Sequence, residues 1–364
     1  MKFGAIRNLG VQSALLSAVL FGAGTPFAKM LLDNVSPWLL AGLLYTGSGV
    51  GLSLIRVIRR SPRVTLGKRE IVPFAGAIFF GGVLAPVLLL VGLSNLTAGT
   101  ASLLLNAEAV FTAVIAWVVF SENVDRRIVL GMLAIVAGAV VLSAGGGLGQ
   151  SGGAGSSGDV LADILPTLAV LGACLCWGID NNLTRKVALT DAMWLAAVKG
   201  GVAGPVNLVL AIAVGAQLPA VGQIAAAMSV GFFAYGVSLA LFIVGMRHTG
   251  TARAGAYFAI APFFGAALAV VLGEPITLPL LTAGLLMAVG IWLHLSEKHV
   301  HEHTHEAITH DHSHVHDEHH QHEHEEAVGD RTRHSHVHTH NATTHTHEHY
   351  PDSHHRHDHP RHDA

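Results

Sequence analysis

The stretch GTASLLLNAEAVFTAVIAWVVFSEN, which begins at Gly99, is repeated in outline by GTARAGAYFAIAPFFGAALAVVLGEP, which begins at Gly250. Each copy starts with Gly-Thr-Ala, has aromatic residues at its centre and ends near a glutamate, Glu122 or Glu274. Each is also long and apolar enough to cross a bilayer, which needs about 20 mostly apolar residues to span about 30 Å of hydrocarbon. The pair therefore predicts a membrane protein built from two related halves.

The composition argues against a soluble protein. Of the 364 residues, 51% are hydrophobic and 12% are charged, whereas a soluble domain carries about 25% charged residues. The two cysteines, Cys174 and Cys176, lie in an apolar run and are interpreted as small core residues, because they form no disulfide or zinc-knuckle pattern. No Gly-rich phosphate-binding motif is present. We therefore expect neither an enzyme nor an ATP-driven pump.

Windows of about 20 apolar residues predict ten membrane-spanning helices. The first is too long for the apolar region of a signal peptide and is expected to be retained. The ten ranges are Val11–Leu32, Pro37–Val57, Ile71–Leu93, Thr100–Phe120, Ile128–Ala144, Leu161–Gly178, Ala192–Val214, Ile224–Met246, Ala254–Leu272 and Leu278–Leu295.

The positions of the basic residues support this count. Lysine and arginine collect in cytoplasmic loops of membrane proteins. With a cytoplasmic N-terminus, 19 of the 21 basic residues fall in cytoplasmic segments or, for Arg56, at the cytoplasmic end of a span, whereas Lys29 and Lys199 fall inside other spans. We therefore expect both termini to be cytoplasmic, in a cell inner membrane.

A Gly/Ser-rich segment, Gly145–Gly158, divides the spans into five and five. The resulting organisation is a cytoplasmic N-terminus (1–10), a first repeat (11–144), an outer linker (145–160), a second repeat (161–296) and a His-rich cytoplasmic tail (297–364). FGAGTPFAK, from Phe21, is likewise echoed by WGIDNNLTRK, from Trp177. Because each repeat has an odd number of helices, the second copy is inverted in the membrane, as in many secondary transporters.

These motifs resemble the paired EamA repeats of the drug/metabolite transporter superfamily, over about residues 12–144 and 165–295. The resemblance rests on Phe21-Gly22 with Lys29, on Trp177-Gly178 with Arg185, and on Pro262 with Gly273-Glu274. It implies a ten-helix bundle around a central cavity, and export or exchange of small polar metabolites, often driven by ion gradients. The first repeat departs from the family pattern at Ala109, where many members have proline, and at Ser121, where many have glycine.

Ionisable residues inside the spans are the candidates for transport, because placing a charge in hydrocarbon costs at least about 2.5–3.5 kcal/mol. Glu108 lies near the middle of the fourth predicted helix and is expected to act as the coupling or substrate carboxyl. A static ion pair or hydrogen bond is the alternative. Lys199, in the seventh predicted helix, is expected to be its counter-charge or to bind an anionic group.

Other polar residues are weaker candidates for the same pathway. Lys29 lies near the outer end of its helix, where a lysine can reach the headgroups. Asn106 precedes Glu108 by two residues, and Asp180 begins a polar run, Asp180–Asn182, that is also explained by the inner interface. Glu122 and Glu274 fall at helix ends and are expected to be loop or cap residues.

Four prolines lie inside predicted spans, at Pro26, Pro86, Pro205 and Pro262. Each removes a backbone donor and kinks its helix. In a membrane the freed carbonyls are tolerated where they are buried in protein or line a wet cavity. The prolines therefore predict gates or discontinuous helices, with ordinary packing as the alternative.

The tail holds 24 of the 26 histidines and few apolar residues. Its composition predicts disorder, and its imidazoles predict loose, unselective binding of Zn, Ni or Co. The candidate ligands are His299, His301, His303, His305, His310, His312, His314, His316, His334, His336, His338 and His340. Three roles of the tail stay open: it buffers metal, it regulates transport by folding over the inner mouth, or it delivers metal to the pore.

The sequence thus predicts an all-α membrane protein with two inverted five-helix repeats and a disordered His-rich tail. Its expected function is export of small metabolites, such as amino acids or related polar compounds, by ion-coupled alternating access. Efflux of Ni, Co or Zn, and a metal sensor or buffer without transport, are the alternatives. The expected partners are the lipid bilayer, a small-molecule substrate and divalent metal ions. No nucleic acid or required cofactor is expected, and a homodimer stays open.

Overall fold

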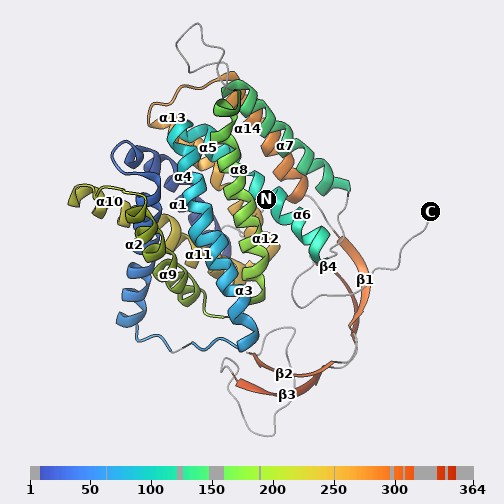
Figure 1. Ribbon diagram of the computed structural model, residues 1–364. Coiled ribbons are helices and arrows are strands. Elements are labelled where there is room, and N and C mark those ends of the chain that lie inside the picture. The colour runs from blue at the N-terminus through green and yellow to red at the C-terminus, as the bar shows by residue number, and fades with distance from the viewer. Residues whose placement is uncertain are drawn as a thin grey trace, which may run out of the picture. The chain divides into compact units, whose positions relative to one another are not determined.

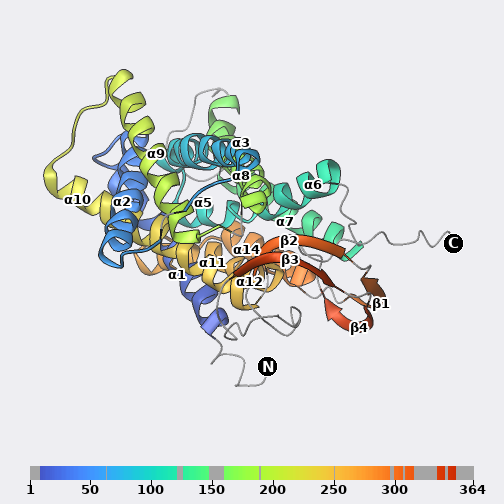
Figure 2. The same ribbon diagram turned by 90° about the horizontal axis from the view of Figure 1, so that it is seen from below.

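The computed structural model describes residues 9–62, 64–120, 126–146, 160–187, 190–249 and 251–295, together with 299–305, 308–314, 334–340 and 343–349. The chain forms two units, Met1–Glu297 and Lys298–Ala364, and each is described by itself. All the regular secondary structure in the described residues of the first unit is helical (Figures 1 and 2).

The first repeat contains seven α-helices and a π-helix: α1 (Leu9–Leu32), α2 (Pro37–Ile58), α3 (Lys68–Ile78), the π-helix η2 (Phe79–Leu84), α4 (Ala85–Asn95), α5 (Ala98–Leu104), α6 (Ala107–Phe120) and α7 (Arg126–Gly146). The second contains α8 (Val160–Thr184), the 3-10 helix η3 (Arg185–Val187), α9 (Ala192–Ala213), α10 (Val221–Gly231), the π-helix η4 (Phe232–Val237), α11 (Ser238–Thr249), α12 (Thr251–Phe258), α13 (Ala261–Val271) and α14 (Leu278–Leu295).

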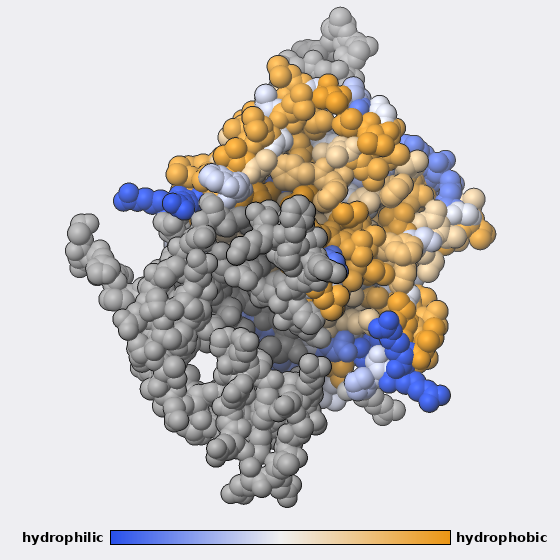
Figure 3. All heavy atoms as spheres, turned by 180° about the vertical axis from the view of Figure 1, so that it is seen from behind, coloured by the Kyte–Doolittle hydropathy of each residue, from blue (hydrophilic) through white to orange (hydrophobic). Residues whose placement is uncertain are grey.

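Eight helical segments in the described part of the chain are long and apolar enough to cross a membrane. Two shorter apolar helices, Ala261–Val271 and Leu278–Leu293, lie where the ninth and tenth spans are predicted. Large apolar side chains such as Val118, Ile212 and Leu285 are exposed on these helices, and Figure 3 shows apolar residues over much of one face. This surface is typical of a helical membrane protein, and the count of ten stays a prediction.

The third span of each repeat contains a six-residue π-helix, η2 in Phe79–Leu84 and η4 in Phe232–Val237. Both begin with a Phe-Phe pair whose rings meet edge to face, with centroids 5.3 Å apart for Phe79–Phe80 and 5.0 Å for Phe232–Phe233. Local π-helices are rare and occur mostly as insertions in α-helices. Their matching positions support the relationship between the two halves.

The fourth span of each repeat is also broken. Pro262 lies in the first turn of α13, and its missing N–H and its ring end α12 four residues earlier, at Phe258. In the first repeat α5 ends before Asn106, whose side chain donates to the carbonyl of Leu103 at 2.9 Å. A local bond of this kind competes with the helix hydrogen bonds.

Glycines bring related helices of the two repeats into close contact. In the packing of α2 against α9, a Cβ on Gly200 would meet the amide nitrogen of Gly49. Where α7 packs against α14, a Cβ on Gly138 would lie 2.8 Å from the Met287 side chain. Small residues permit such backbone approach between membrane helices. The two repeats therefore interlock through equivalent helices.

Four strands are described in the second unit: β1 (His299–His305), β2 (Ile308–His314), β3 (His334–His340) and β4 (Thr343–His349). β1 pairs with β4 and β2 with β3, both antiparallel. These strands differ from the disorder that the composition predicts. Histidine alternates with Thr, Val, Ser and Glu in these segments, and such a period-two pattern fits a strand in which successive residues face opposite sides.

Candidate functional site

A buried ion pair joins α8 to α9. The ammonium group of Lys199 contacts Oδ2 of Asp180, and the two side chains are 13% and 7% exposed. One turn further along α8, the hydroxyl of Thr184 donates to Oδ1 of Asp180 at 3.0 Å. Both carboxylate oxygens therefore have partners, which a buried carboxylate needs to offset the loss of water.

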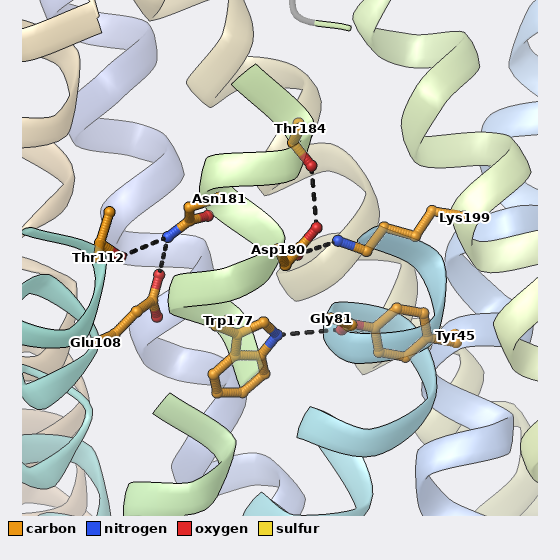
Figure 4. Close-up of polar contacts among 9 residues, drawn as sticks. All are labelled: Tyr45, Gly81, Glu108, Thr112, Trp177, Asp180, Asn181, Thr184 and Lys199. Atoms are coloured by element: carbon orange, nitrogen blue, oxygen red, sulfur yellow. Dashed lines mark hydrogen bonds and ion pairs between the residues drawn. The ribbon is translucent and has the colours of Figure 1, made fainter. Parts of the chain in front are cut away.

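Asn181, which follows Asp180 on α8, connects this helix to α6. Asn181 Nδ2 donates to Oε1 of Glu108 at 2.8 Å and lies 3.3 Å from Oγ1 of Thr112. Figure 4 shows Asp180 and Asn181 pointing to opposite sides of α8, the first toward Lys199 and the second toward Glu108. The two polar contacts thus lie side by side across one helix.

The predicted pairing of Lys199 with Glu108 is wrong, because Lys199 pairs with Asp180. The cause is the length of the helix. The sixth span is predicted to end at Gly178, whereas α8 continues to Thr184 and carries Asp180–Asn182 inside it. Asp180 and Asn182 are buried, at 5% and 6% exposure. The alternative interpretation, that this polar run lies exposed at the inner membrane interface, therefore does not hold for Asp180 and Asn182.

Two backbone carbonyls of the π-helix η2 bind side chains from three other helices. Gly81 O accepts from Tyr45 Oη at 2.6 Å and from Trp177 Nε1 at 3.1 Å (Figure 4). Gly82 O accepts from Asn207 Nδ2 at 3.1 Å. Pro86 has no N–H to give to Gly82, four residues earlier, so this carbonyl is free for a side chain.

Gly81 also makes room for the ion pair, because a Cβ at this position would overlap the Asp180 carboxylate. Tyr45, Trp177, Gly81 and Asn207 do not appear among the residues that the sequence predicts for the site. The position of Pro86 four residues after Gly82 was the signal that could have drawn attention to this carbonyl.

Aromatic rings fill the centre of the bundle next to the ion pair. Phe21 and Trp177, which hold equivalent positions in the two repeats, meet edge to face with centroids 6.3 Å apart. Tyr235 of η4 lies 5.9 Å from Phe21 and 5.4 Å from Tyr45 by the same measure. This aromatic cluster contains residues of both repeats and borders the polar site through Trp177 and Tyr45 (Figure 4).

Lys29 lies away from the ion pair, at the turn between α4 and α5. Its Nζ donates to the carbonyls of Leu93 and Ser94 at 2.8 and 3.1 Å, where the end of α4 carries a partial negative charge. Glu274 accepts from the amides of Ala98 and Gly99 at 2.6 and 2.8 Å. Lys29 thus binds the end of α4 and Glu274 the start of α5, and the predicted cap residue Glu274 caps a helix of the other repeat.

The remaining candidates are dispersed. Asn106 is 2% exposed, and its Oδ1 has no hydrogen-bond partner among the described residues. Pro26 and Pro205 lie inside α1 and α9, whereas Pro86 and Pro262 begin new helical segments. Cys174 and Cys176 are buried and form no disulfide within the described residues. Glu122 and His316 lie outside the described residues. No group of three or more His, Cys, Asp or Glu side chains converges in the described part of the chain.

A second ion pair joins Arg56, in the last turn of α2, to Asp191, which precedes the first residue of α9. Arg56 Nη1 contacts Oδ2 of Asp191 at 2.9 Å, and Asp191 Oδ1 accepts from the amide of Trp194 at 3.0 Å as the N-cap of α9. Partial burial acts to raise the pKa of Asp191, but the Trp194 amide and the Arg56 guanidinium outweigh it, so the pKa lies below its usual value.

Comparison with known families decides the identity of this helical bundle. The model of the EamA-like transporter family matches residues 8–144 and 165–296, most of the chain. The chain belongs to the EamA-like transporter family. It is therefore a multi-pass membrane protein of a transporter family.

Two relatives of this EamA-like protein are named as uncharacterized transporters. An uncharacterized transporter of Methanothermobacter thermautotrophicus is 26% identical over 305 residues, which cover 79% of this chain and 86% of that protein. The uncharacterized transporter YvbV of Bacillus subtilis is 26% identical over 198 residues, 52% of this chain and 59% of that protein. A protein crystal structure matches with a TM-score of 0.58 at 19% identity, over 78% of this chain and 95% of the other, and shows the fold alone.

Proposed function

We propose that this EamA-like protein exports small polar metabolites that carry both a carboxylate and an ammonium group, such as amino acids, by ion-coupled alternating access. The observation that carries the proposal is the buried Asp180–Lys199 pair. A pair of opposite charges in a membrane protein is expensive to bury, and such residues mark substrate or ion pathways. The pair lies between two helices, next to Tyr45 and Trp177 of the aromatic cluster (Figure 4).

A zwitterion matches the two members of this pair. Its carboxylate replaces Asp180 as the partner of Lys199, and its ammonium group replaces Lys199 as the partner of Asp180. Each charge then keeps a partner, so that binding leaves no buried charge unpaired. An anion or a cation alone satisfies only one of the two. In this proposal the rest of the ligand contacts the Tyr45 and Trp177 rings, which lie next to the pair (Figure 4).

Glu108 is the coupling group in this proposal. Asp180, Lys199 and ionised Glu108 together carry one surplus negative charge, and Asn181 gives Glu108 a neutral partner only. Binding of one proton to Glu108 removes the surplus. Because charges are costly in the bilayer, the protonated form favours the return of the empty site from the outer to the cytoplasmic side, so that a proton enters as a ligand leaves.

The direction of transport follows from the orientation that the basic residues predict. In that orientation α8 runs from the outer side to the cytoplasmic side. Trp177 then lies deeper than Asp180, and Thr184 lies nearest the cytoplasm. In that orientation the polar site lies on the cytoplasmic side of Trp177, and the Lys29 and Glu274 contacts lie toward the outer side. Such a site loads from the cytoplasm, which supports export across the inner membrane.

The test is counterflow in proteoliposomes with a panel of labelled compounds. We expect exchange of one or more neutral amino acids, loss of exchange in Asp180→Asn and in Lys199→Met, and wild-type exchange in the control Glu70→Gln, whose carboxylate caps α3 at an exposed position. Exchange confined to simple anions or cations would contradict the proposal.

Metal efflux is tested in the same vesicles by including Ni²⁺, Co²⁺ and Zn²⁺ in the panel. No described contact favours it, since the described helices do not gather three metal-binding side chains. Transport of these ions that stops in Glu108→Gln would replace the amino-acid proposal.

A further inference from the structure

We propose that a cavity between the end of α2 and helices α9 and α11 binds the phosphodiester headgroup of an anionic phospholipid, a lipid with one net negative charge. The cavity has a volume of about 250 Å³ and is lined by residues of all three helices or their ends. Such a lipid site goes beyond transport and does not rest on the proposed function. It gives a role to an arginine that the transport proposal does not use.

One part of the cavity lining is apolar. Met193 comes from the first turn of α9, and Ala240 and Val244 come from α11. Because Ala240 and Val244 are four residues apart, they lie on the same face of α11. Pockets for drug-sized ligands have volumes of about 300–1,000 Å³, so this cavity suits a headgroup rather than a whole lipid.

The polar part of the lining contains Arg59, Ser61 and Asp191. Each oxygen of Asp191 already has a partner, because Oδ2 pairs with Arg56 at 2.9 Å and Oδ1 accepts from the Trp194 amide at 3.0 Å. In the described part of the chain, no hydrogen bond or ion pair engages the guanidinium group of Arg59. The cavity therefore offers one positive charge without a partner, which matches the single negative charge of a phosphodiester. A zwitterionic headgroup adds an ammonium group that would have to compete with Arg56 for Asp191.

The way α2 ends brings both donors to the cavity. Arg60 has a left-handed backbone, with φ at 49°. Its amide donates to the carbonyl of Val57 at 3.1 Å, and the amide of Ser61 donates to the carbonyl of Arg56 at 3.0 Å. These are the two bonds of a Schellman helix end, in which glycine is the usual left-handed residue. The turn at Arg60 lets the residues on either side of it line one cavity, and the Ser61 hydroxyl is a second donor for a phosphate oxygen.

The same end of α2 marks the level of the lipid headgroups. Leu54, Val57 and Ile58 are large apolar side chains that are exposed on this helix, and the exposed residues Arg59 and Arg60 follow directly. Exposed apolar residues suit the hydrocarbon, and arginines at a helix end reach the polar interface. Acyl chains can thus cover the apolar surface of α2 while the phosphate reaches Arg59. Basic pockets between membrane helices are known to bind anionic headgroups.

A lipid bound here would link the two repeats, because α2 belongs to the first repeat and α9 and α11 belong to the second. The cavity is built from residues far apart in the sequence, and it is lost when the chain unfolds. A ligand that binds only the folded protein stabilises it by mass action. Binding is therefore expected to raise the unfolding temperature, Tm.

The experiment uses the full-length protein in a non-ionic detergent. It is titrated with phosphatidylglycerol, with phosphatidylcholine of the same acyl chains, and with inorganic phosphate. Native mass spectrometry counts the bound lipids, and thermal unfolding measures the shift in Tm. The test variant is Arg59→Gln. The matched control is Arg69→Gln, which makes the same substitution at an exposed position on α3.

We expect one phosphatidylglycerol molecule to bind the wild type and Arg69→Gln at least tenfold more tightly than phosphatidylcholine does, and to raise Tm. Arg59→Gln should bind phosphatidylglycerol about tenfold more weakly than the wild type, because a charge-assisted hydrogen bond is lost. Equal weakening in the two variants would show that only the net charge of the basic segment matters, and would overturn the proposal.

The other two ligands separate the sources of the phosphate group. Inorganic phosphate is expected to leave Tm unchanged, since it lacks the acyl chains that lie on α2. An Arg59-dependent rise in Tm with inorganic phosphate, as large as that with phosphatidylglycerol, would identify a free-phosphate site and overturn the lipid assignment. Equal affinity of the wild type for phosphatidylcholine and phosphatidylglycerol would contradict the charge match.

Discussion

The carboxylate of Asp180 on α8 pairs with the ammonium group of Lys199 on α9, with both side chains buried and Gly81 leaving room beside them. Both charges belong to the second repeat, and the neighbouring Asn181 reaches Glu108 of the first. α8 thus connects the ion pair to the lone carboxyl. A ligand or proton that changes one of these contacts acts on the same helix as the other.

Removal of one member of the ion pair should cost more stability than removal of both. Lys199→Met leaves Asp180 charged and buried, which typically costs about 3–5 kcal/mol, whereas replacing both charges is often close to neutral. We therefore expect the double variant Asp180→Asn with Lys199→Met to unfold at a higher denaturant concentration than Lys199→Met alone. Denaturant unfolding in detergent micelles measures this. A double variant that is less stable than either single variant would contradict the structural role of the pair.

Gly81→Ala should disturb the site without changing any charge. Its Cβ would overlap the Asp180 carboxylate, so we expect the carboxylate to move from Lys199 and substrate exchange to fall at least tenfold. Gly201→Ala on α9 is the matched control, because a Cβ there meets nothing within 4 Å. The control should keep wild-type exchange. Equal rates in the two variants would show that the Asp180 position does not limit transport.

Glu274 should stabilise the contact between the repeats. It accepts two amide hydrogen bonds from the start of α5, and bonds to charged groups contribute about 1.5–3 kcal/mol each. Glu274→Ala is expected to lower the unfolding free energy by about 2 kcal/mol or more. Glu70→Ala, which removes a local cap on α3, should cost about 1 kcal/mol or less. The unfolding midpoints of the two variants measure the difference, and a larger loss in Glu70→Ala would contradict it.

The Arg56–Asp191 contact should give a pH-dependent term in stability. The pKa of Asp191 is lowered in the folded protein, so its ionised form stabilises the fold above the unfolded pKa of about 3.9. This contribution is lost as the pH falls through the folded pKa. Asp191→Asn keeps a capping side chain, and we expect its stability deficit at pH 7 to shrink below pH 4. Thermal unfolding at a series of pH values tests this, and a deficit that grows toward low pH would contradict it.

The fold was predictable because helices in a bilayer need long apolar runs and the two halves repeat their motifs. The repeated Gly-Thr-Ala and glutamate motifs and the Phe21 and Trp177 positions predicted a membrane protein of the EamA type. Periodicity carries no signal for the π-helices, since an insertion of this kind changes hydrogen bonding and not hydropathy. The strands of the tail were not predicted, because the polar, His-rich composition favoured disorder more strongly than the alternation of histidine with other residues favoured strands.

The sequence predicted that Glu108 and Lys199 belong to the site, but it did not predict which residues they contact. Glu108 and Lys199 stood out because charges are rare inside spans. Their partners depended on where α8 ends, and helix boundaries are the least certain part of any sequence interpretation. Pro86 signals that the Gly82 carbonyl is free, but the side chains that donate to the η2 carbonyls, Tyr45, Trp177 and Asn207, come from other helices, which no local pattern predicts.

The central claim is that Glu108 couples an ion gradient to movement of a ligand held by Asp180 and Lys199. The most direct measurement compares two activities of Glu108→Gln in proteoliposomes: exchange of labelled amino acid at equal pH, and uphill accumulation driven by a pH gradient. The account predicts that exchange persists and that gradient-driven accumulation is lost, while the wild type performs both. Gradient-driven accumulation at the wild-type level in Glu108→Gln would contradict it.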